Sequence, residues 1–139
     1  MSRPAEGFFR HELVRFHHCD PAGIVFYPRY VEMINATIED WFAEVVGISF
    51  AEIHGPLHFA VPIASLDVQF RSPSRLGEVL RLGVRLERLG SSSVTLHVTA
   101  ANEGREVFAA RVTLVLISKD DYRPKPWPQP FREAMSDAH

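Results

Sequence analysis

The stretch YVEMINATIEDWFAEVVG, residues 30–47, predicts one long helix. Its apolar residues recur at intervals of three and four, which is the spacing of one face of an α-helix. These residues are Val31, Ile34, Ile38, Trp41, Phe42 and Val45. Pro28 suits the first helical turn, where the N–H that it lacks would have no partner, and Gly47 suits the end because glycine adopts the left-handed conformation at little cost. We therefore expect an amphipathic helix of about four turns.

The segments on either side of this helix alternate apolar and polar residues, as strands do. Before the helix, residues 8–16 are rich in β-forming side chains. After it, alternation covers residues 65–70, 80–87 and 94–100, and residues 107–117 are more continuously apolar. Turn signals at residues 90–92 and 102–104 separate the last three segments. One strand, one segregated helix and four further strands predict an α+β fold, with an antiparallel five-stranded sheet wrapped around the helix.

The residues from Asp120 onward leave this pattern, because prolines alternate there with other residues. These prolines are Pro124, Pro126, Pro128 and Pro130. Proline cannot extend a central strand, so we expect residues 120–139 to form an extended, polyproline-like, peripheral tail. We find no internal repeat and no linker, and we expect residues 1–139 to be a single domain. A sheet covered by one helix leaves its outer face open, which favours a homo-oligomer.

The composition excludes several classes of protein. The chain has 139 residues and a formal net charge of -2, so it has no overall attraction to nucleic acid or to anionic membranes. Its single cysteine, Cys19, excludes an intramolecular disulfide and hence a disulfide-stapled secreted scaffold. No apolar run approaches the about 20 residues of a membrane-spanning helix, and residues 1–7 lack the apolar stretch of a signal peptide. We expect a cytoplasmic protein with no nucleic-acid or membrane partner.

The run CDPAGIVFYPRY, residues 19–30, joins the first predicted strand to the helix and carries the most informative chemistry. Asp20 opens an Asp-Pro-Ala-Gly turn. The first amides of a helix have no intrahelical partners, and they can bind an anion or polarise a carbonyl. Asp20 is therefore either a residue that only caps the turn, or a nucleophile or general base beside an electrophilic helix start.

The same run closely resembles the active-site segment of the 4-hydroxybenzoyl-CoA thioesterase family, which has the hot-dog fold and hydrolyses acyl-CoA thioesters. The predicted strand order resembles that family over nearly the whole chain, although the motif is the more specific signal. The resemblance implies that Asp20 is the catalytic carboxylate and that the backbone N–H of Tyr27 holds the thioester carbonyl. It also implies that residues 61–65 form a strand running past the carboxylate, with Val61 and Ser65 near the substrate. No metal or cofactor is implied beyond coenzyme A, which is part of the substrate.

The resemblance further implies a homotetramer built from dimers, with active sites at subunit interfaces. It also bears on specificity, because members specific for a 4-hydroxylated ring place an acidic residue at the helix position of Asn35. The helical spacing places Asn35 on the same face as Ile38, Phe42 and Val45. Asn35 is then either a core amide bonded to backbone or a lining residue of the acyl pocket. We expect a benzoyl or hydroxybenzoyl thioester as substrate, with a short aliphatic acyl-CoA or a non-catalytic acyl-CoA-binding scaffold as alternatives.

The sequence gives only weak signals for other kinds of site. His17, His18, Cys19 and Asp20 are adjacent, so their side chains point to opposite sides of an extended chain and few could share one metal ion. His54 and His58 enclose Gly55-Pro56, which breaks a helix. The sequence has no Gly-x-Ser-x-Gly elbow and no Gly-rich phosphate loop. Four arginines remain as candidates for contacts to the CoA phosphates, namely Arg71, Arg75, Arg88 and Arg111.

Overall fold

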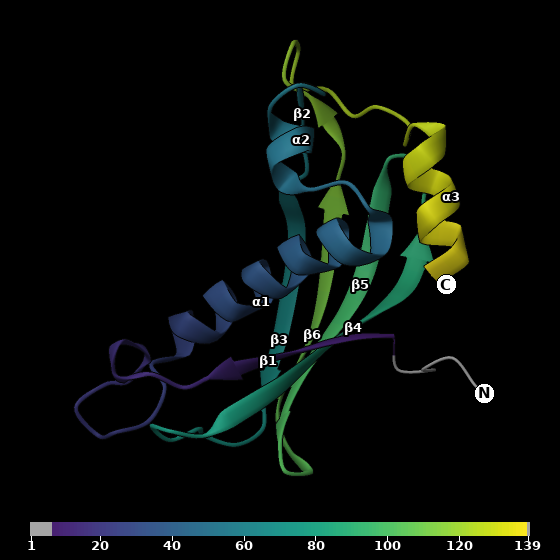
Figure 1. Cartoon of the computed structure of the whole chain (residues 1–139). Coiled ribbons are helices and arrows are strands. Elements are labelled where there is room, and N and C mark those ends of the chain that lie inside the picture. Colours follow the sequence, from purple (N-terminus) through teal and green to yellow (C-terminus); the bar gives the residue numbers. More distant parts are fainter. Residues whose placement is uncertain (1–6, 139) are drawn as a thin grey trace.

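Helix α1, Tyr27–Trp41, is the central element and lies across one face of the main sheet (Figure 1). The computed structural model describes residues 7–138. After Trp41 the helix widens into the π-helical turn η2, Phe42–Val46, which ends at Gly47 with a φ of 82°. The Gly47 amide donates to the Phe42 carbonyl over 2.8 Å. The predicted helix and its glycine stop are confirmed.

The main sheet has five antiparallel strands in the order β1-β4-β5-β6-β3. Their bounds are β1 Phe8–Leu13, β3 Ile63–Phe70, β4 Val79–Leu89, β5 Ser93–Asn102 and β6 Arg105–Val115. The predicted order of strand, long helix and four strands is confirmed. Four short elements were not predicted, because each is too short to show a period: η1 Phe16–His18, α2 Phe50–His54, β2 Phe59–Ala60 and β7 Ile117–Ser118. Strands β2 and β7 pair with each other.

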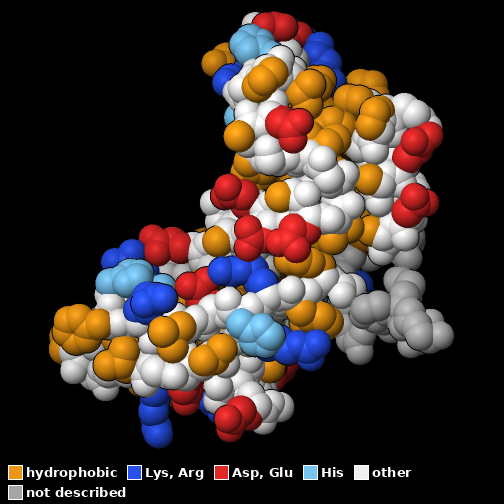
Figure 2. Space-filling model, viewed as in Figure 1, with side chains coloured by type: hydrophobic (Ala, Val, Ile, Leu, Met, Phe, Trp, Pro, Cys, Tyr) orange, Lys and Arg blue, Asp and Glu red, His pale blue; other side chains and the backbone are white. Residues whose placement is uncertain are grey.

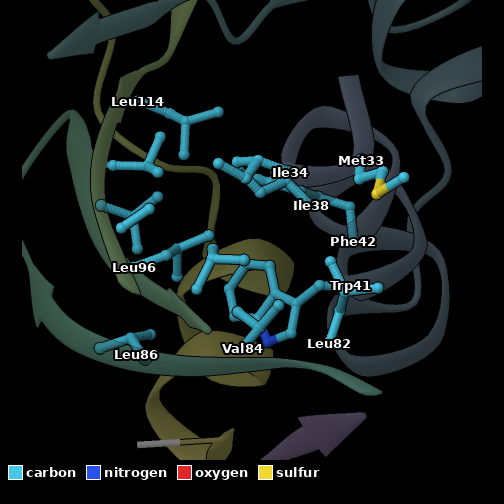
Figure 3. Packing of buried hydrophobic residues seen from close by; sticks show 14 of the residues in the cluster. Met33, Ile34, Ile38, Trp41, Phe42, Leu82, Val84, Leu86, Leu96 and Leu114 are labelled. Carbon is cyan, nitrogen blue, oxygen red and sulfur yellow. The ribbon is translucent and has the colours of Figure 1, made fainter. Parts of the chain in front are cut away.

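The hydrophobic core lies between α1 and the inner face of the sheet (Figure 3). Along β4, the alternate residues Leu80, Leu82 and Leu86 are buried, while Arg81 and Arg85 between them are exposed. Figure 3 shows the facing side chains, which are Met33, Ile34, Ile38, Trp41 and Phe42 on the helical side and Leu82, Val84, Leu86, Leu96 and Leu114 on the sheet side. Each buried side chain of this kind stabilises the fold by about 1.5–3 kcal/mol.

Within residues 7–138, no helix is both long and apolar enough to cross a membrane.

The C-terminal segment differs from the extended peripheral tail that the prolines predicted. Residues Gln129–Ala138 form helix α3, which packs against η2 and β4. Phe131 and Met135 of α3 are buried, as is Trp127 just before it. Pro130 stands in the first turn of α3, where a proline is tolerated because its missing N–H would have no partner. The last of the alternating prolines therefore stands in the first turn of a helix, and residues 127–135 contribute to the core.

A Met135→Ala substitution should lower the free energy of unfolding by about 2–5 kcal/mol, because it leaves a cavity at a fully buried position. Urea denaturation measures this change. Ser136→Ala, at an exposed position of the same helix, is the matched control and should change stability by less than about 0.5 kcal/mol. Equal effects of the two substitutions would contradict the packing of α3 on the sheet.

Candidate active site

The loop between β1 and α1 folds back on itself at Asp20. The carboxylate Oδ1 of Asp20 accepts from the Ala22 amide over 2.9 Å, and the Gly23 amide donates to the Asp20 carbonyl over 2.9 Å. The Asp20 amide donates to the Ile24 carbonyl, also over 2.9 Å. Gly23 has a φ of +81°, a conformation that other residues rarely adopt. The predicted turn is confirmed. One carboxylate oxygen of Asp20 accepts a hydrogen bond within the turn, and the residue remains partly exposed.

A buried pair of hydroxyl groups anchors this loop to the sheet. The Tyr30 hydroxyl of α1 donates to Ser74 Oγ over 2.8 Å, and the carbonyl of Ser74 accepts from the Val25 amide over 2.9 Å. Both side chains are buried, and burial raises the pKa of Tyr30 above its ordinary value of 10.0. The phenol therefore stays a neutral donor. These bonds join three parts of the chain, namely α1, the Asp20 loop and the segment that follows β3.

Tyr30→Phe should destabilise the protein by about 1–3 kcal/mol, because it leaves the buried Ser74 hydroxyl without its donor. A double-mutant cycle with Ser74→Ala checks the origin of the effect. The double variant should lose clearly less than the sum of the two single losses, as measured by urea denaturation. Additive losses would show that the two hydroxyl groups do not act as a pair.

The start of α1 presents an unpaired amide. Phe26 is the N-cap residue and offers no side-chain cap, Tyr27 is the first helical residue, and Pro28 follows. Among the backbone hydrogen bonds within residues 7–138, none uses the Tyr27 amide. This amide is available to a ligand oxygen and lies at the positive end of the helix dipole. The role of the Tyr27 amide toward a thioester carbonyl, which the resemblance implies, stays a prediction.

A surface cavity of about 650 Å³ contains Asp20. Its lining is formed by Phe16, His17, Cys19, Asp20, Pro21, Gly23 and Leu76. Phe16 and Leu76 are 83% and 53% exposed, and Figure 2 shows hydrophobic side chains gathered at this end of the molecule. A carboxylate therefore lies among apolar groups that could contact an acyl or pantetheine chain. The sequence did not indicate Phe16 or Leu76 as lining residues. Leu76 reaches the loop only through the fold, where its amide donates to the Gly23 carbonyl.

A single chain does not bring Val61 and Ser65 to this cavity. The end of β3 that approaches the helix start is Phe70, whose ring centroid lies 6.1 Å from that of Tyr27. Successive strand residues rise about 3.3 Å each, so Ser65 lies roughly 16 Å further along the strand. Val61 precedes β3 and is buried. The roles of both residues at the substrate remain predictions.

Asn35 does not lie on the buried face of α1, and its placement there by helical spacing is wrong. The buried residues of α1 are Tyr30, Met33, Ile34, Thr37, Ile38 and Trp41, and Asn35 is exposed. The spacing argument used Phe42 and Val45, which belong to η2, where the wider π-turn changes the angle per residue. The interpretation of Asn35 as a core amide is excluded. Its contact with an acyl group stays a prediction.

Strand β3 forms one edge of the main sheet. Seven of its eight residues are exposed, as the burial along the strand shows. Ile63, Leu66 and Phe70 are 36%, 39% and 49% exposed. A long apolar edge strand with unpaired backbone groups is a template for pairing with another strand. This edge runs from the segment 61–65 to the neighbourhood of Tyr27.

The other sequence candidates do not gather at one place. In the part of the chain that the structure describes, no three His, Cys, Asp or Glu side chains are grouped as metal ligands would be. His58 Nδ1 lies 2.7 Å from a carboxylate oxygen of Asp120. Arg71 is paired with Glu106 and Arg111 with Glu87. Contacts of Arg71, Arg75, Arg88 or Arg111 with CoA phosphates stay a prediction.

Comparison with known proteins agrees with this geometry. Residues 14–135 match the model of the thioesterase-like superfamily. The chain belongs to this superfamily. Hydrolysis of a thioester is the class of reaction that membership assigns to it, and the enzyme class that the sequence predicted is confirmed. The superfamily is broader than the 4-hydroxybenzoyl-CoA thioesterase family that the motif resembles.

Individual relatives within this superfamily are distant. A 1,4-dihydroxy-2-naphthoyl-CoA hydrolase of Thermosynechococcus vestitus is 27% identical over 119 residues, covering 85% of this chain and 81% of the relative. The crystal structure of a 1,4-dihydroxy-2-naphthoyl-CoA thioesterase from Synechocystis has a TM-score of 0.86 at 20% identity, covering 94% of this chain and 96% of that one. A gentisyl-coenzyme A thioesterase structure has a TM-score of 0.82 at 23% identity, covering 90% and 99%. These two likenesses establish the hot-dog fold.

Proposed function

We propose that this thioesterase hydrolyses the thioester of a small aromatic acyl-CoA to the free acid and coenzyme A. The observation that carries the proposal is the position of Asp20 in an apolar cavity, on a hydrogen-bonded loop that leads into the unpaired amide of Tyr27. The motif from Cys19 to Tyr30 supports the same assignment by its resemblance to the 4-hydroxybenzoyl-CoA thioesterase family.

In the proposed reaction, the Asp20 carboxylate either attacks the thioester carbonyl or takes a proton from the attacking water. The negative charge that develops on the carbonyl oxygen is stabilised by the Tyr27 N–H and the helix dipole, and one such donor contributes about 3 kcal/mol. The C–S bond then breaks, and the CoA thiolate leaves with the electron pair and takes up a proton. In the nucleophilic route the acyl group stays on Asp20 as a mixed anhydride, which water then hydrolyses to the free acid and the regenerated carboxylate. In the general-base route the water adds directly to the carbonyl carbon. No metal ion or cofactor takes part in this proposal.

The aromatic class is supported by relatives named for naphthoyl-CoA and gentisyl-CoA substrates. Asn35 is neutral, so within this proposal a benzoyl ring or one hydroxylated elsewhere than at the 4-position is at least as suitable as 4-hydroxybenzoyl. A short aliphatic acyl-CoA and a non-catalytic acyl-CoA-binding scaffold are the alternatives that experiment must exclude. A cytoplasmic location, consistent with the single cysteine, belongs to the same proposal.

The proposed assembly is a homotetramer made of two dimers. Two copies that pair through their β3 edges in antiparallel fashion would bring Ser65 of the partner subunit toward Phe70 and Tyr27. This arrangement would also cover Leu66 and Phe70, which are half-exposed in one chain. Each active site would then combine Asp20 and Tyr27 of one chain with Val61 and Ser65 of its partner, which accounts for their separation in a single chain.

The function is tested with a free-thiol assay on benzoyl-, 3-hydroxybenzoyl-, 4-hydroxybenzoyl-, 1,4-dihydroxy-2-naphthoyl- and short aliphatic acyl-CoA. Aromatic thioesters should be turned over fastest, and Asp20→Asn should reduce kcat by about 10²–10⁴-fold because the carboxylate acts on the reacting carbon or its water. Asp137→Asn, on the exposed side of α3, is the matched control and should keep full activity.

Two results would count against this function. A clear preference for aliphatic thioesters would replace the aromatic class with the aliphatic alternative. Equal rates for the wild type, Asp20→Asn and Asp20→Ala would remove Asp20 from the reaction, and rates no higher than without protein would favour the scaffold.

Leu66→Arg tests the proposed dimer, because it places a charge at the centre of the β3 edge. Sedimentation velocity should show a smaller species than the wild type at the same concentration, and kcat/KM should fall with it because each site loses its partner residues. Glu133→Arg, on the exposed side of α3, is the control for adding an arginine to the surface. A variant that keeps the wild-type assembly would show that the subunits associate through another surface.

A further inference from the structure

His18 is a buried histidine in the loop that carries Asp20, and the proposed reaction has so far given it no part. Its side chain is only 6% exposed. The Arg15 amide donates to His18 Nδ1 over 2.8 Å. A ring nitrogen that accepts a hydrogen bond carries no proton, so the imidazole is neutral with its hydrogen on Nε2. This bond spans the short helix η1, Phe16–His18, from the residue before it to its last residue.

The main chain of His18 reaches the start of α1. Its carbonyl accepts from the Phe26 amide over 2.9 Å, and Phe26 is the N-cap residue directly before Tyr27. The neighbouring pair, Cys19 and Val25, forms an antiparallel bridge. His18 is therefore bonded to the segment entering the loop through its ring and to the segment leaving the loop through its carbonyl. The carbonyl bond joins the segments that carry Asp20 and Tyr27, and the ring bond fixes the turn from which that carbonyl projects.

Burial, more than the charges around it, favours the neutral ring of His18. Burial lowers the pKa of His18 below its ordinary value of 6.5, and His17 beside it acts in the same direction. Glu12 of β1 and Glu32 of α1 raise the pKa, while Arg29 of α1 lowers it, and burial is the largest of these effects. Protonation would turn Nδ1 from an acceptor into a donor and so break the bond to the Arg15 amide.

We propose that His18 is a positioning residue for thioester hydrolysis: its neutral imidazole, by accepting the Arg15 amide, holds the Asp20 carboxylate and the Tyr27 amide in their working arrangement. This inference rests on the proposed function. His18 does not touch the substrate and acts through the loop. It follows that activity needs an uncharged acceptor at this position rather than an imidazole as such.

Two substitutions separate the acceptor from the bulk of the side chain. The amide oxygen of asparagine stands at the same number of bonds from the backbone as Nδ1, so His18→Asn keeps an acceptor for the Arg15 amide. His18→Leu keeps an apolar side chain of similar size and removes the acceptor. His11→Asn, at an exposed position of β1, is the matched control for replacing a histidine by asparagine.

His18→Leu should lower kcat by about 10–100-fold with little change in KM, because a misplaced reacting group costs up to roughly 10²-fold in rate. The kcat of His18→Asn should stay within about threefold of the wild-type kcat, because the hydrogen bond from the Arg15 amide is kept. Equal kcat losses in His18→Leu and His18→Asn would overturn the inference.

The pH profile supplies a readout that a purely packing role would not move. As the pH falls from 7 to 5, the wild type should lose kcat more steeply than His18→Asn, because only the wild type has a ring to protonate. Asp20 is present in both proteins and does not cause a difference between them. Superimposable profiles would contradict the inference. This comparison still decides the matter if His18→Leu fails to fold.

Amide hydrogen exchange separates a failure of this inference from a failure of the proposed function, because it needs no substrate. At pH 7 the Arg15 amide should exchange about tenfold or more faster in His18→Leu than in the wild type, and at a near wild-type rate in His18→Asn. If the wild type hydrolyses no thioester but shows this pattern, the proposed function is wrong and the role of His18 in ordering the loop stands. Unchanged Arg15 exchange in His18→Leu overturns the role of His18 itself.

Discussion

Burial of one apolar face of α1 against a single antiparallel sheet is the constraint on which the rest of the structure depends. The buried residues of the helix meet the inward residues of β4, β5 and β6, and no second helix of comparable length covers the sheet (residues 7–138). Because the helix must lie across the sheet, its first turn emerges at the end of the molecule away from α3 (Figure 1). The unpaired amide of Tyr27 is therefore held by the core in a place that a ligand can reach.

The loop that precedes α1 carries the candidate site. Two anchors hold it, the buried Tyr30–Ser74 pair on one side and His18 on the other. Between them, Asp20 is fixed by its own turn rather than by ion pairs. A carboxylate held by local backbone bonds keeps one oxygen free of strong partners, which suits a group that must react. Turn capping and catalysis are thus compatible at Asp20, and the two interpretations of the sequence need not compete.

The parts of the structure that could be predicted from sequence are those with a repeating signal or a specific motif. The 3.6-residue period located α1, and the two-residue period located β3, β4 and β5. Composition located β1 and β6, and the motif from Cys19 to Tyr30 located the loop. Helix α3 was missed because the prolines that lead into it dominate the pattern and its few apolar residues, Phe131 and Met135 among them, span little more than one turn. Asn35 was misplaced because the spacing argument aligned it with Phe42 and Val45 of the π-turn η2, whereas the buried stripe within α1 itself leaves Asn35 exposed. Leu76 and Ser74 come to the site through tertiary contacts, which leave no trace in local sequence.

The proposed pairing of two copies through the exposed edge of β3 would make activity depend on dilution. An edge strand with half-exposed apolar side chains is costly to leave in water, so pairing of two copies and completion of the site would be one event. In that case the specific activity of the enzyme would not be constant but would follow the law of mass action, falling when the subunit concentration drops below the dissociation constant of the pair. A chain of this kind would also exchange subunits with close relatives that share the edge, and each mixed pair would contain two sites with different linings.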